Sequence, residues 1–271
     1  MSYPSLLTIQ GVHAYITQLA AVLDPQSRYV RELMEIVLCA DGVADLHDRL
    51  RQGCRGRRFS GPAIFDQMTL ADQLRACLIT NETQIYRFED GEAEVVREAL
   101  RAINRIHIAS RDDTPIQVLV APCSHGAEAF TVSSLAYSEG IKVVVDAWDI
   151  QPKCIASARC GVVVTGFPGE YLLQEAIVTA EILEPITFEV ADLLAWSEGE
   201  DDRLWDIVQC RNFLGYFTPS IARRLLVKLM TATRPGGLLV LDPFPAEKFV
   251  WLEAMLSGEK FQKRGPAAWK K

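Results

Sequence analysis

Arg211 and Asn212 are the side chains whose types and position most clearly indicate chemistry in this sequence. They follow the run 206–210, in which Asp206 precedes the apolar residues Ile207 and Val208. About one helix length further along the chain, a Pro-Gly turn leads into the apolar run 237–241. In an open parallel sheet, ligands bind beyond the carboxyl ends of the strands. Polar residues placed directly after an apolar run are therefore the first candidates for a binding or catalytic site.

A second candidate is the turn in residues 118–130, where an apolar run meets a small-residue turn around Gly126 and then a helix. Such a turn brings backbone N–H groups close to a nucleotide-like ligand. It is not a GxGxxG motif, and a single glycine makes a poor pyrophosphate cradle, which favours a ligand without phosphates. Glu128 can accept a hydrogen bond from a ligand ammonium, or it can simply interact with the helix dipole.

Asp149 closes the apolar run 143–149, roughly twenty residues after Gly126. An acidic side chain at that place usually binds two ribose hydroxyls. The alternative is a turn or helix cap, because Gln151 and Pro152 follow. Taken with the Gly126 turn, Asp149 indicates an adenosyl ligand.

Asp192 and Leu193 follow the run that begins at Phe188. The carboxylate can anchor the exocyclic amine of adenine while Leu193 covers the ring, since an aromatic ligand needs an apolar wall and a polar anchor. A capped loop is the alternative for Asp192. His125 lacks a spaced partner that would identify a triad, so we leave it outside the catalytic set and expect it to be solvated.

The elements that must position these residues change character along the chain. Residues 1–80 read as a helical domain, with apolar residues at helical spacing in 30–39 and 71–79. Between these stretches lies an arginine cluster, and Gly53 and Gly56 are expected to prevent a helix through it. Its members are Arg49, Arg51, Arg55, Arg57 and Arg58. A solvated loop or a surface for an acidic partner would both explain the cluster.

After a further helix at 93–108, strands alternate with helices from residue 115 onward. That order builds a doubly wound parallel sheet of the Rossmann-like α/β class. The expected strands are 117–121, 142–147, 186–190, 206–210, 237–241 and one near Trp269, with helices at 127–138 and 152–158. The predicted domains are therefore 1–80, helical, and 81–271, ligand-binding.

Composition excludes several classes of function. The chain has 271 residues, of which 49% are hydrophobic and 23% charged, and its net charge of -7 argues against a nucleic-acid surface. Seven cysteines without a CxxC pair and four histidines off ligand spacing indicate no metal site. No run approaches the roughly twenty apolar residues of a membrane helix, so we expect a reduced cytoplasmic protein without membrane insertion.

Read together, these segments resemble the CheR-type methyltransferases, which use S-adenosylmethionine to methylate glutamate side chains of chemotaxis receptors. The resemblance runs from about residue 80 to the C-terminus and implies a class I methyltransferase sheet that binds S-adenosyl-L-methionine. It implies that Asn81, Thr83 and Arg87 face the cofactor. The matching segments, in the order of the family, are 80–87 (TNETQIYR), 123–128 (CSHGAE), 147–150 (AWDI), 158–161 (ARCG), 192–194 (DLL), 210–212 (CRN) and 216–217 (YF).

The sequence departs from the family in two places where the methyl acceptor should bind. Residues 161–185 are too short for the full β-subdomain that contributes to receptor docking in the family. The usual Gly-His-Ser after the Pro-x-Gly strand is replaced by Leu241-Asp-Pro. The fold and the cofactor are therefore better supported than the receptor as substrate.

The resemblance implies methyl transfer to a carboxylate acceptor, with a protein glutamate as the family's example. A carboxylate is ionised at neutral pH, so no general base is required. Arg211 is expected to hold it and Tyr216 to orient it, although Arg211 can instead pair an internal acid and Tyr216 can pack on the sheet. Two alternatives remain: methylation of a small metabolite, and a non-catalytic cofactor-binding regulator whose helical domain and arginine cluster bind a partner.

Overall fold

The computed structural model divides the chain into two compact units. One contains Met1–Glu82 together with Gly215–Ala222, and the other contains Thr83–Leu214 and Arg223–Lys271. The domain boundary near residue 80 stays a prediction. The residues that the structure describes are 8–24, 28–54, 69–70, 73–74, 92–165, 174–196, 203–241, 250–265 and 268–271.

Three helices lie in the first unit: α1 (Ile9–Ala20), α2 (Arg28–Leu38) and α3 (Val43–Cys54). Each buries apolar residues three or four positions apart, such as Val12 and Ile16 in α1 and Leu46 and Leu50 in α3. These stripes let short helices form by packing on each other, because isolated helices of this length are marginal in water.

The expectation of no helix through the arginine cluster is wrong for residues 49–54. Helix α3 runs through Arg49 and continues past Gly53 to Cys54. A glycine costs a helix only about 1 kcal/mol, which the completely buried Leu46 and Leu50 can offset. Residues 55–58 lie outside the described part of the chain.

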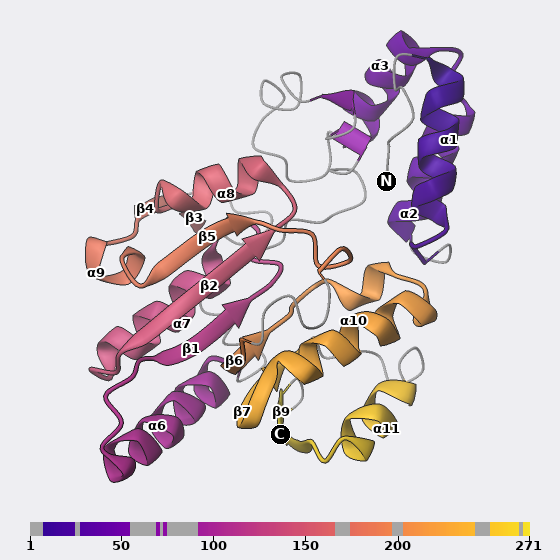
Figure 1. Cartoon of the computed structure of the whole chain (residues 1–271). Coiled ribbons are helices and arrows are strands. Elements are labelled where there is room, and N and C mark those ends of the chain that lie inside the picture. The colour runs from indigo at the N-terminus through magenta and orange to yellow at the C-terminus, as the bar shows by residue number, and fades with distance from the viewer. Residues whose placement is uncertain are drawn as a thin grey trace. The chain divides into compact units, whose positions relative to one another are not determined.

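Seven strands form a single sheet in the second unit (Figure 1), in the order β5-β2-β1-β6-β7-β9-β8. The first five run parallel, and β9 pairs antiparallel with both β7 and β8. When only the seven strands of this sheet are numbered along the chain, the order is 3-2-1-4-5-7-6. The predicted Rossmann-like sheet is therefore confirmed. The strands are β1 (Ile116–Val120), β2 (Val143–Asp149), β5 (Ile186–Val190), β6 (Trp205–Gln209), β7 (Thr233–Val240), β8 (Gln262–Gly265) and β9 (Ala268–Lys270).

Helices cover both faces of this sheet, which explains why its central strands are almost continuously apolar. On β2, Val145 and Ala147 join the core beneath α6 and α7, while Asp146 and Trp148 face the other side and contact Trp205. The helices of this unit are α6 (Glu92–Ser110), α7 (Ala127–Ser138), α8 (Pro152–Arg159), α9 (Ala180–Leu183), α10 (Pro219–Ala232) and α11 (Val250–Gly258).

Two differences from the expected elements concern the later part of the chain. Strand β7 begins at Thr233, four residues earlier than expected, so Pro235 lies inside it. The register between β6 and β7 shifts after Trp205, and a strand irregularity is where proline is tolerated. Strand β8 was not predicted, and its only sheet partner among the described strands is β9.

The segment after α8 forms a small sheet of its own. β3 (Val162–Thr165) pairs antiparallel with β4 (Gln174–Ile177), and residues 166–173 between them are not described.

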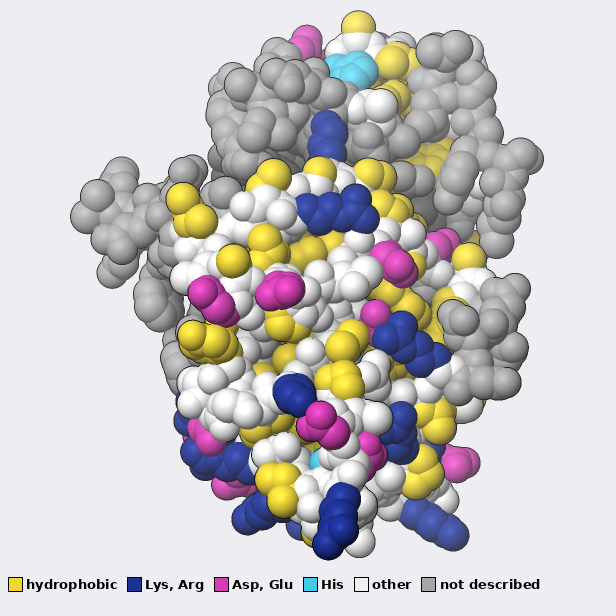
Figure 2. Space-filling view, turned by 60° about the vertical axis from the view of Figure 1, so that its left-hand side comes forward, with side chains coloured by type: hydrophobic (Ala, Val, Ile, Leu, Met, Phe, Trp, Pro, Cys, Tyr) yellow, Lys and Arg dark blue, Asp and Glu magenta, His cyan; other side chains and the backbone are white. Residues whose placement is uncertain are grey.

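No helix in the described part of the chain is both long and apolar enough to cross a bilayer. Figure 2 shows basic and acidic side chains interspersed over the described part of one face.

Candidate functional site

The carboxyl ends of four neighbouring strands meet at one edge of the sheet. Beyond the strands themselves, Ala121 N donates to Gln209 O at 2.9 Å and Cys123 N donates to Trp148 O at 2.7 Å. Ala191 N donates to Asp149 O at 3.0 Å. These bonds continue the sheet in the order β5-β2-β1-β6, so the segments that follow these strands lie next to one another.

The turn after β1 requires glycine at position 126. Gly126 has a φ of 89°, and a Cβ built there would lie 2.9 Å from the ring of Phe130. The turn is closed by Gly126 N donating to Cys123 O at 2.8 Å. Glu128 lies in the first turn of α7 and is 9% exposed, at the helix end where the dipole favours a carboxylate.

Asp149 ends β2 and connects two of these segments through its carboxylate. Oδ2 accepts a hydrogen bond from Ser124 N and Oδ1 accepts one from Gln151 N, both at 2.8 Å. Burial raises the pKa of Asp149, and the two backbone hydrogen bonds oppose that shift. An ionised carboxylate has about four lone-pair positions, so each oxygen can accept one further hydrogen bond.

Asp192 caps the loop after β5, which is the alternative to adenine binding that the sequence left open. Its Oδ1 accepts Leu194 N at 2.9 Å, and its carbonyl accepts Trp196 N at 2.9 Å. Its Oδ2 makes no hydrogen bond to any described residue. Leu193 beside it is 6% exposed and supplies an apolar wall.

The loop that carries Asp192 is fixed by contacts that sequence reasoning missed. Trp196 packs edge-to-face on Trp148 and Trp205, with ring centroids 5.6 and 6.1 Å away. Trp205 Nε1 donates to Asp146 Oδ2 at 2.6 Å, and Lys228 of α10 donates to the carbonyls of residues 193, 194 and 196. No local pattern predicts this cluster, because its members come from β2, the loop after β5, β6 and α10.

Arg211 and Asn212 follow β6 at the same edge. Cys210 N donates to Val240 O at 2.8 Å, which carries the sheet one residue past β6. Arg211 is 5% exposed, and Asn212 has a φ of 50°, a left-handed conformation that asparagine tolerates better than most residues. A buried guanidinium thus lies directly after the strand end, where the sequence predicted a site.

Tyr216 ends the short 3₁₀ helix η1 (Leu214–Tyr216) and is half-buried. Its carbonyl accepts a hydrogen bond from Asp24 N at 2.8 Å, and both residues belong to the first compact unit. Asn81, Thr83 and Arg87 lie outside the described residues, so their expected role stays a prediction.

His125 differs from the expectation of a solvated loop histidine. It is half-buried, its Nε2 lies 3.7 Å from Cys154 Sγ, and burial lowers its pKa. Burial also raises the pKa of the Cys123 and Cys154 thiols, that of Cys154 to about 12. The described residues contain no group of three side chains that could hold a metal ion.

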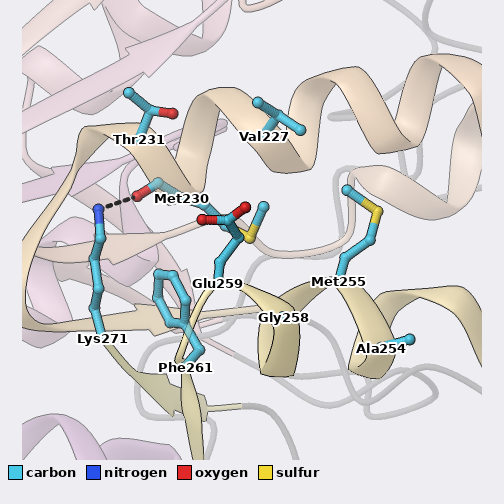
Figure 3. A pocket seen from close by; sticks show the side chains of 9 residues that line it. All are labelled: Val227, Met230, Thr231, Ala254, Met255, Gly258, Glu259, Phe261 and Lys271. Carbon is cyan, nitrogen blue, oxygen red and sulfur yellow. Dashed lines mark hydrogen bonds between the residues drawn. The ribbon is translucent and has the colours of Figure 1, made fainter.

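A separate cavity has a volume of about 370 Å³. Figure 3 shows the side chains that line it. It is lined by Val227 and Met230 of α10, Met255 of α11 and Phe261, among others. Lys271 Nζ, also in its lining, donates to Thr233 O at 2.8 Å, the first residue of β7. The cavity therefore lies at the amino-terminal end of β7, and it contains none of the predicted site residues.

Comparison with known proteins identifies the family. Residues 81–243, more than half of the chain, match the CheR methyltransferase, SAM binding domain. The chain belongs to this family. The match confirms the predicted family, and the cofactor of that domain is S-adenosyl-L-methionine, as predicted.

Individual relatives share only a low sequence identity with this chain. The probable biofilm formation methyltransferase WspC of Pseudomonas putida is 25% identical over 238 residues, 80% of this chain and 54% of that protein. An uncharacterized 104.1 kDa protein of Rhodobacter capsulatus is 28% identical over 193 residues, 65% of this chain and 20% of that protein. The chain thus spans about half or less of these relatives. An O-methyltransferase family protein from Burkholderia thailandensis has a TM-score of 0.47 at 14% identity, covering 96% of this chain and 81% of that structure.

The donor and acceptor chemistry of the edge fits this cofactor. The segments after β1, β2 and β5 carry three acidic side chains: Glu128, Asp149 and Asp192. Residues 121–128, 149–151 and 191–196 contain no Lys or Arg. S-adenosylmethionine presents an ammonium, ribose hydroxyls and an adenine amine that can donate to carboxylates, and it has no phosphate that would need a basic cradle.

Proposed function

We propose that this chain transfers a methyl group from S-adenosyl-L-methionine to a carboxylate acceptor, and that the acceptor is a protein glutamate, as in the family. The observation that carries this proposal is the buried guanidinium of Arg211. It comes directly after β6, on the edge that holds Asp149 on β2. Membership of the CheR family and similarity to WspC, which is named a methyltransferase, support the reaction class.

The acidic side chains of the edge have distinct roles in this proposal. Asp149 accepts hydrogen bonds from the ribose hydroxyls, and Asp192 accepts one from the adenine amine through Oδ2. Glu128 accepts one from the amino-acid ammonium, assisted by the opposite charge. S-adenosylmethionine supplies a methyl group already activated by its sulfonium, so the protein contributes mainly alignment.

Arg211 holds the acceptor carboxylate by paired, charge-assisted hydrogen bonds. The acceptor is ionised at neutral pH, so no side chain has to remove a proton from it. His125 is not needed as a base, in agreement with its half-buried position beside Cys154. Tyr216 orients the acceptor or the methyl group.

Methylation of a small metabolite is the second candidate. The described residues between α8 and β5 form two short strands and one short helix, a reduced insert where the family docks its receptor. The other departure, Asp242-Pro243, lies outside the described residues. A non-catalytic regulator is the third candidate, and it predicts cofactor binding without turnover.

The test is incubation with tritiated S-adenosylmethionine and a panel of receptor fragments, protein extract and small-molecule extract. Alkali treatment that releases volatile methanol from a protein band indicates a glutamyl methyl ester. Arg211→Lys keeps the charge but loses the paired geometry, and it should lower transfer at least tenfold while S-adenosylhomocysteine affinity stays within twofold. Label only in small molecules would refute the protein acceptor, and binding without any transfer would refute the enzyme.

A further inference from the structure

The loop after β5 contains a single helical turn in residues 192–196. Trp196 N donates to the carbonyl of Asp192 at 2.9 Å, four positions back, which is the spacing of an α-helix. Asp192 Oδ1 accepts Leu194 N at 2.9 Å, as the side chain at a helix N-cap does. One turn is unstable by itself in water, because it orders several residues for one hydrogen bond. Contacts from elsewhere in the fold must therefore hold it.

The side chain of Lys228 on α10 meets the carbonyls of this turn. Carbonyl groups in the last turn of a helix have no acceptor role within the helix. Lys228 Nζ donates to the carbonyl of Leu193 at 3.3 Å, to that of Leu194 at 3.1 Å and to that of Trp196. An ammonium has three N–H donors, so these three bonds use all of them on one loop. Lys228 and the loop belong to the same compact unit.

The positive charge of Lys228 allows these carbonyls to converge. Carbonyl oxygens carry partial negative charge, so three of them directed at one point repel each other unless a cation lies between them. The tryptophan cluster holds the side chain of Trp196, whereas Lys228 holds the backbone. Without the ammonium, three carbonyls lose their donor at the same time, and the turn opens.

The position of the Asp192 carboxylate depends on this turn. Its bond to Leu194 N exists only while the turn is formed. The residue before it is fixed separately, because Ala191 N donates to the carbonyl of Asp149 at the end of β2, at 3.0 Å. Opening the turn therefore releases the Asp192 side chain and leaves Asp149 in place.

We propose that Lys228 is a positioning residue for the adenine end of the cofactor: its ammonium holds the 192–196 turn, and the turn fixes the direction of the Asp192 carboxylate. This inference rests on the proposed function, in which Asp192 accepts a hydrogen bond from the adenine amine. Lys228 itself does not contact the cofactor. Its loss should therefore change the recognition of the base and leave the ribose and ammonium contacts unchanged.

Lys228→Met removes the ammonium and keeps an unbranched side chain of similar length. Lys271→Met is the matched control, because Lys271 Nζ also donates to two backbone carbonyls, those of Met230 and Thr233, at 2.9 and 2.8 Å. Figure 3 shows the bond to Met230, at the carboxyl end of α10. Both variants lose a lysine that holds carbonyls, but only Lys228 holds the loop of Asp192.

The probe is S-inosylhomocysteine, which has an oxygen where S-adenosylhomocysteine has the adenine amine. The unmodified protein should bind the adenosyl ligand roughly tenfold more tightly in calorimetry, because the inosyl ligand loses one hydrogen bond to a charged group. Lys228→Met should reduce this preference to about twofold or less by weakening the adenosyl ligand. Lys271→Met should keep the preference of the unmodified protein.

Amide hydrogen exchange tests the turn without a ligand. In Lys228→Met, the peptide that contains Leu194 N and Trp196 N should exchange roughly tenfold faster, because the turn opens locally. Peptides of β2 should keep the exchange rate of the unmodified protein, which separates local opening from global unfolding. If Lys228→Met does not fold, Lys228→Gln, which keeps two donors but no charge, takes its place in both measurements.

Three results would overturn the role of Lys228: unchanged exchange in the turn, equal weakening of both ligands, or the same reduced preference in Lys271→Met. Failure of the proposed function looks different. If the unmodified protein binds both ligands equally well, the assignment of Asp192 to adenine fails first. If it prefers the adenosyl ligand and Lys228→Met keeps that preference, only the positioning role fails.

Discussion

Asp149→Asn is the substitution that most directly tests the cofactor site. The Asp149 carboxylate already accepts Ser124 N and Gln151 N, and we propose that its remaining lone pairs accept ribose hydroxyls. A hydrogen bond to a charged group is worth about 1.5–3 kcal/mol, and an amide keeps only one oxygen. Losing one such bond corresponds to a roughly ten- to hundredfold weaker affinity.

The effect on stability should be much smaller. One of the two backbone N–H groups loses its acceptor, at a cost of about 1–3 kcal/mol. Burial raises the pKa of Asp149, so the charged form destabilises the folded state above that pKa, and a neutral amide removes this cost at neutral pH. The two effects oppose each other, and we expect a change of about 1 kcal/mol or less.

Asp206→Asn is the matched control. Asp206 is 5% exposed, accepts Gln117 N at 2.8 Å and pairs with Arg234 at 2.6 Å, but it lies at the amino-terminal end of β6. Titration calorimetry with S-adenosylhomocysteine should show the loss for Asp149→Asn and none for Asp206→Asn. Unchanged affinity in Asp149→Asn, or an equal loss in both variants, would refute the assignment of Asp149 to the ribose.

Three further predictions concern the same unit. Gly126→Ala should lower the free energy of unfolding by at least 2 kcal/mol in a urea titration, about twice the loss for the control Gly140→Ala. Both glycines have a left-handed backbone conformation, but only at Gly126 would the added Cβ meet a neighbouring ring. Glu128→Gln should weaken S-adenosylhomocysteine binding roughly tenfold and leave binding of 5′-methylthioadenosine, which lacks the ammonium, unchanged; equal losses for both ligands would contradict the assignment. At pH 8, iodoacetamide should alkylate exposed Cys160 and spare Cys154, whose pKa of about 12 leaves roughly one thiol in ten thousand ionised, as peptide mass spectrometry can check.

Local pattern was enough to predict the elements that carry the site. Helix α7 has the predicted bounds, because its start follows from the Gly126 turn and its length from an unbroken run of helix-compatible residues. Asp149 and Arg211 were each predicted to follow an apolar strand at the carboxyl edge of a parallel sheet, and the structure places β2 and β6 in one parallel sheet with β1 between them.

Other features could not be predicted because they depend on long-range contacts. The start of β7 at Thr233 depends on its pairing with Trp205, and α3 continues past Gly53 because its buried leucines pack within the helical unit. His125 was expected to be a solvated loop residue, but the structure has it half-buried, with its Nε2 3.7 Å from Cys154 Sγ of α8.

The sequence by itself determined the order of the parallel strands and of the helices α7 and α8 between them, the acidic and basic residues at the strand ends, and the resemblance to the methyltransferase family. These depend on hydrophobic periodicity and on residue type, which are local properties of the chain. Only the tertiary structure decided that the carboxylate of Asp149 holds the Ser124 N–H and that Leu23 pairs with Phe217. Every residue has the same backbone hydrogen-bonding groups, so the sequence around such a group does not indicate its partner. The packing of the whole chain decides which groups pair.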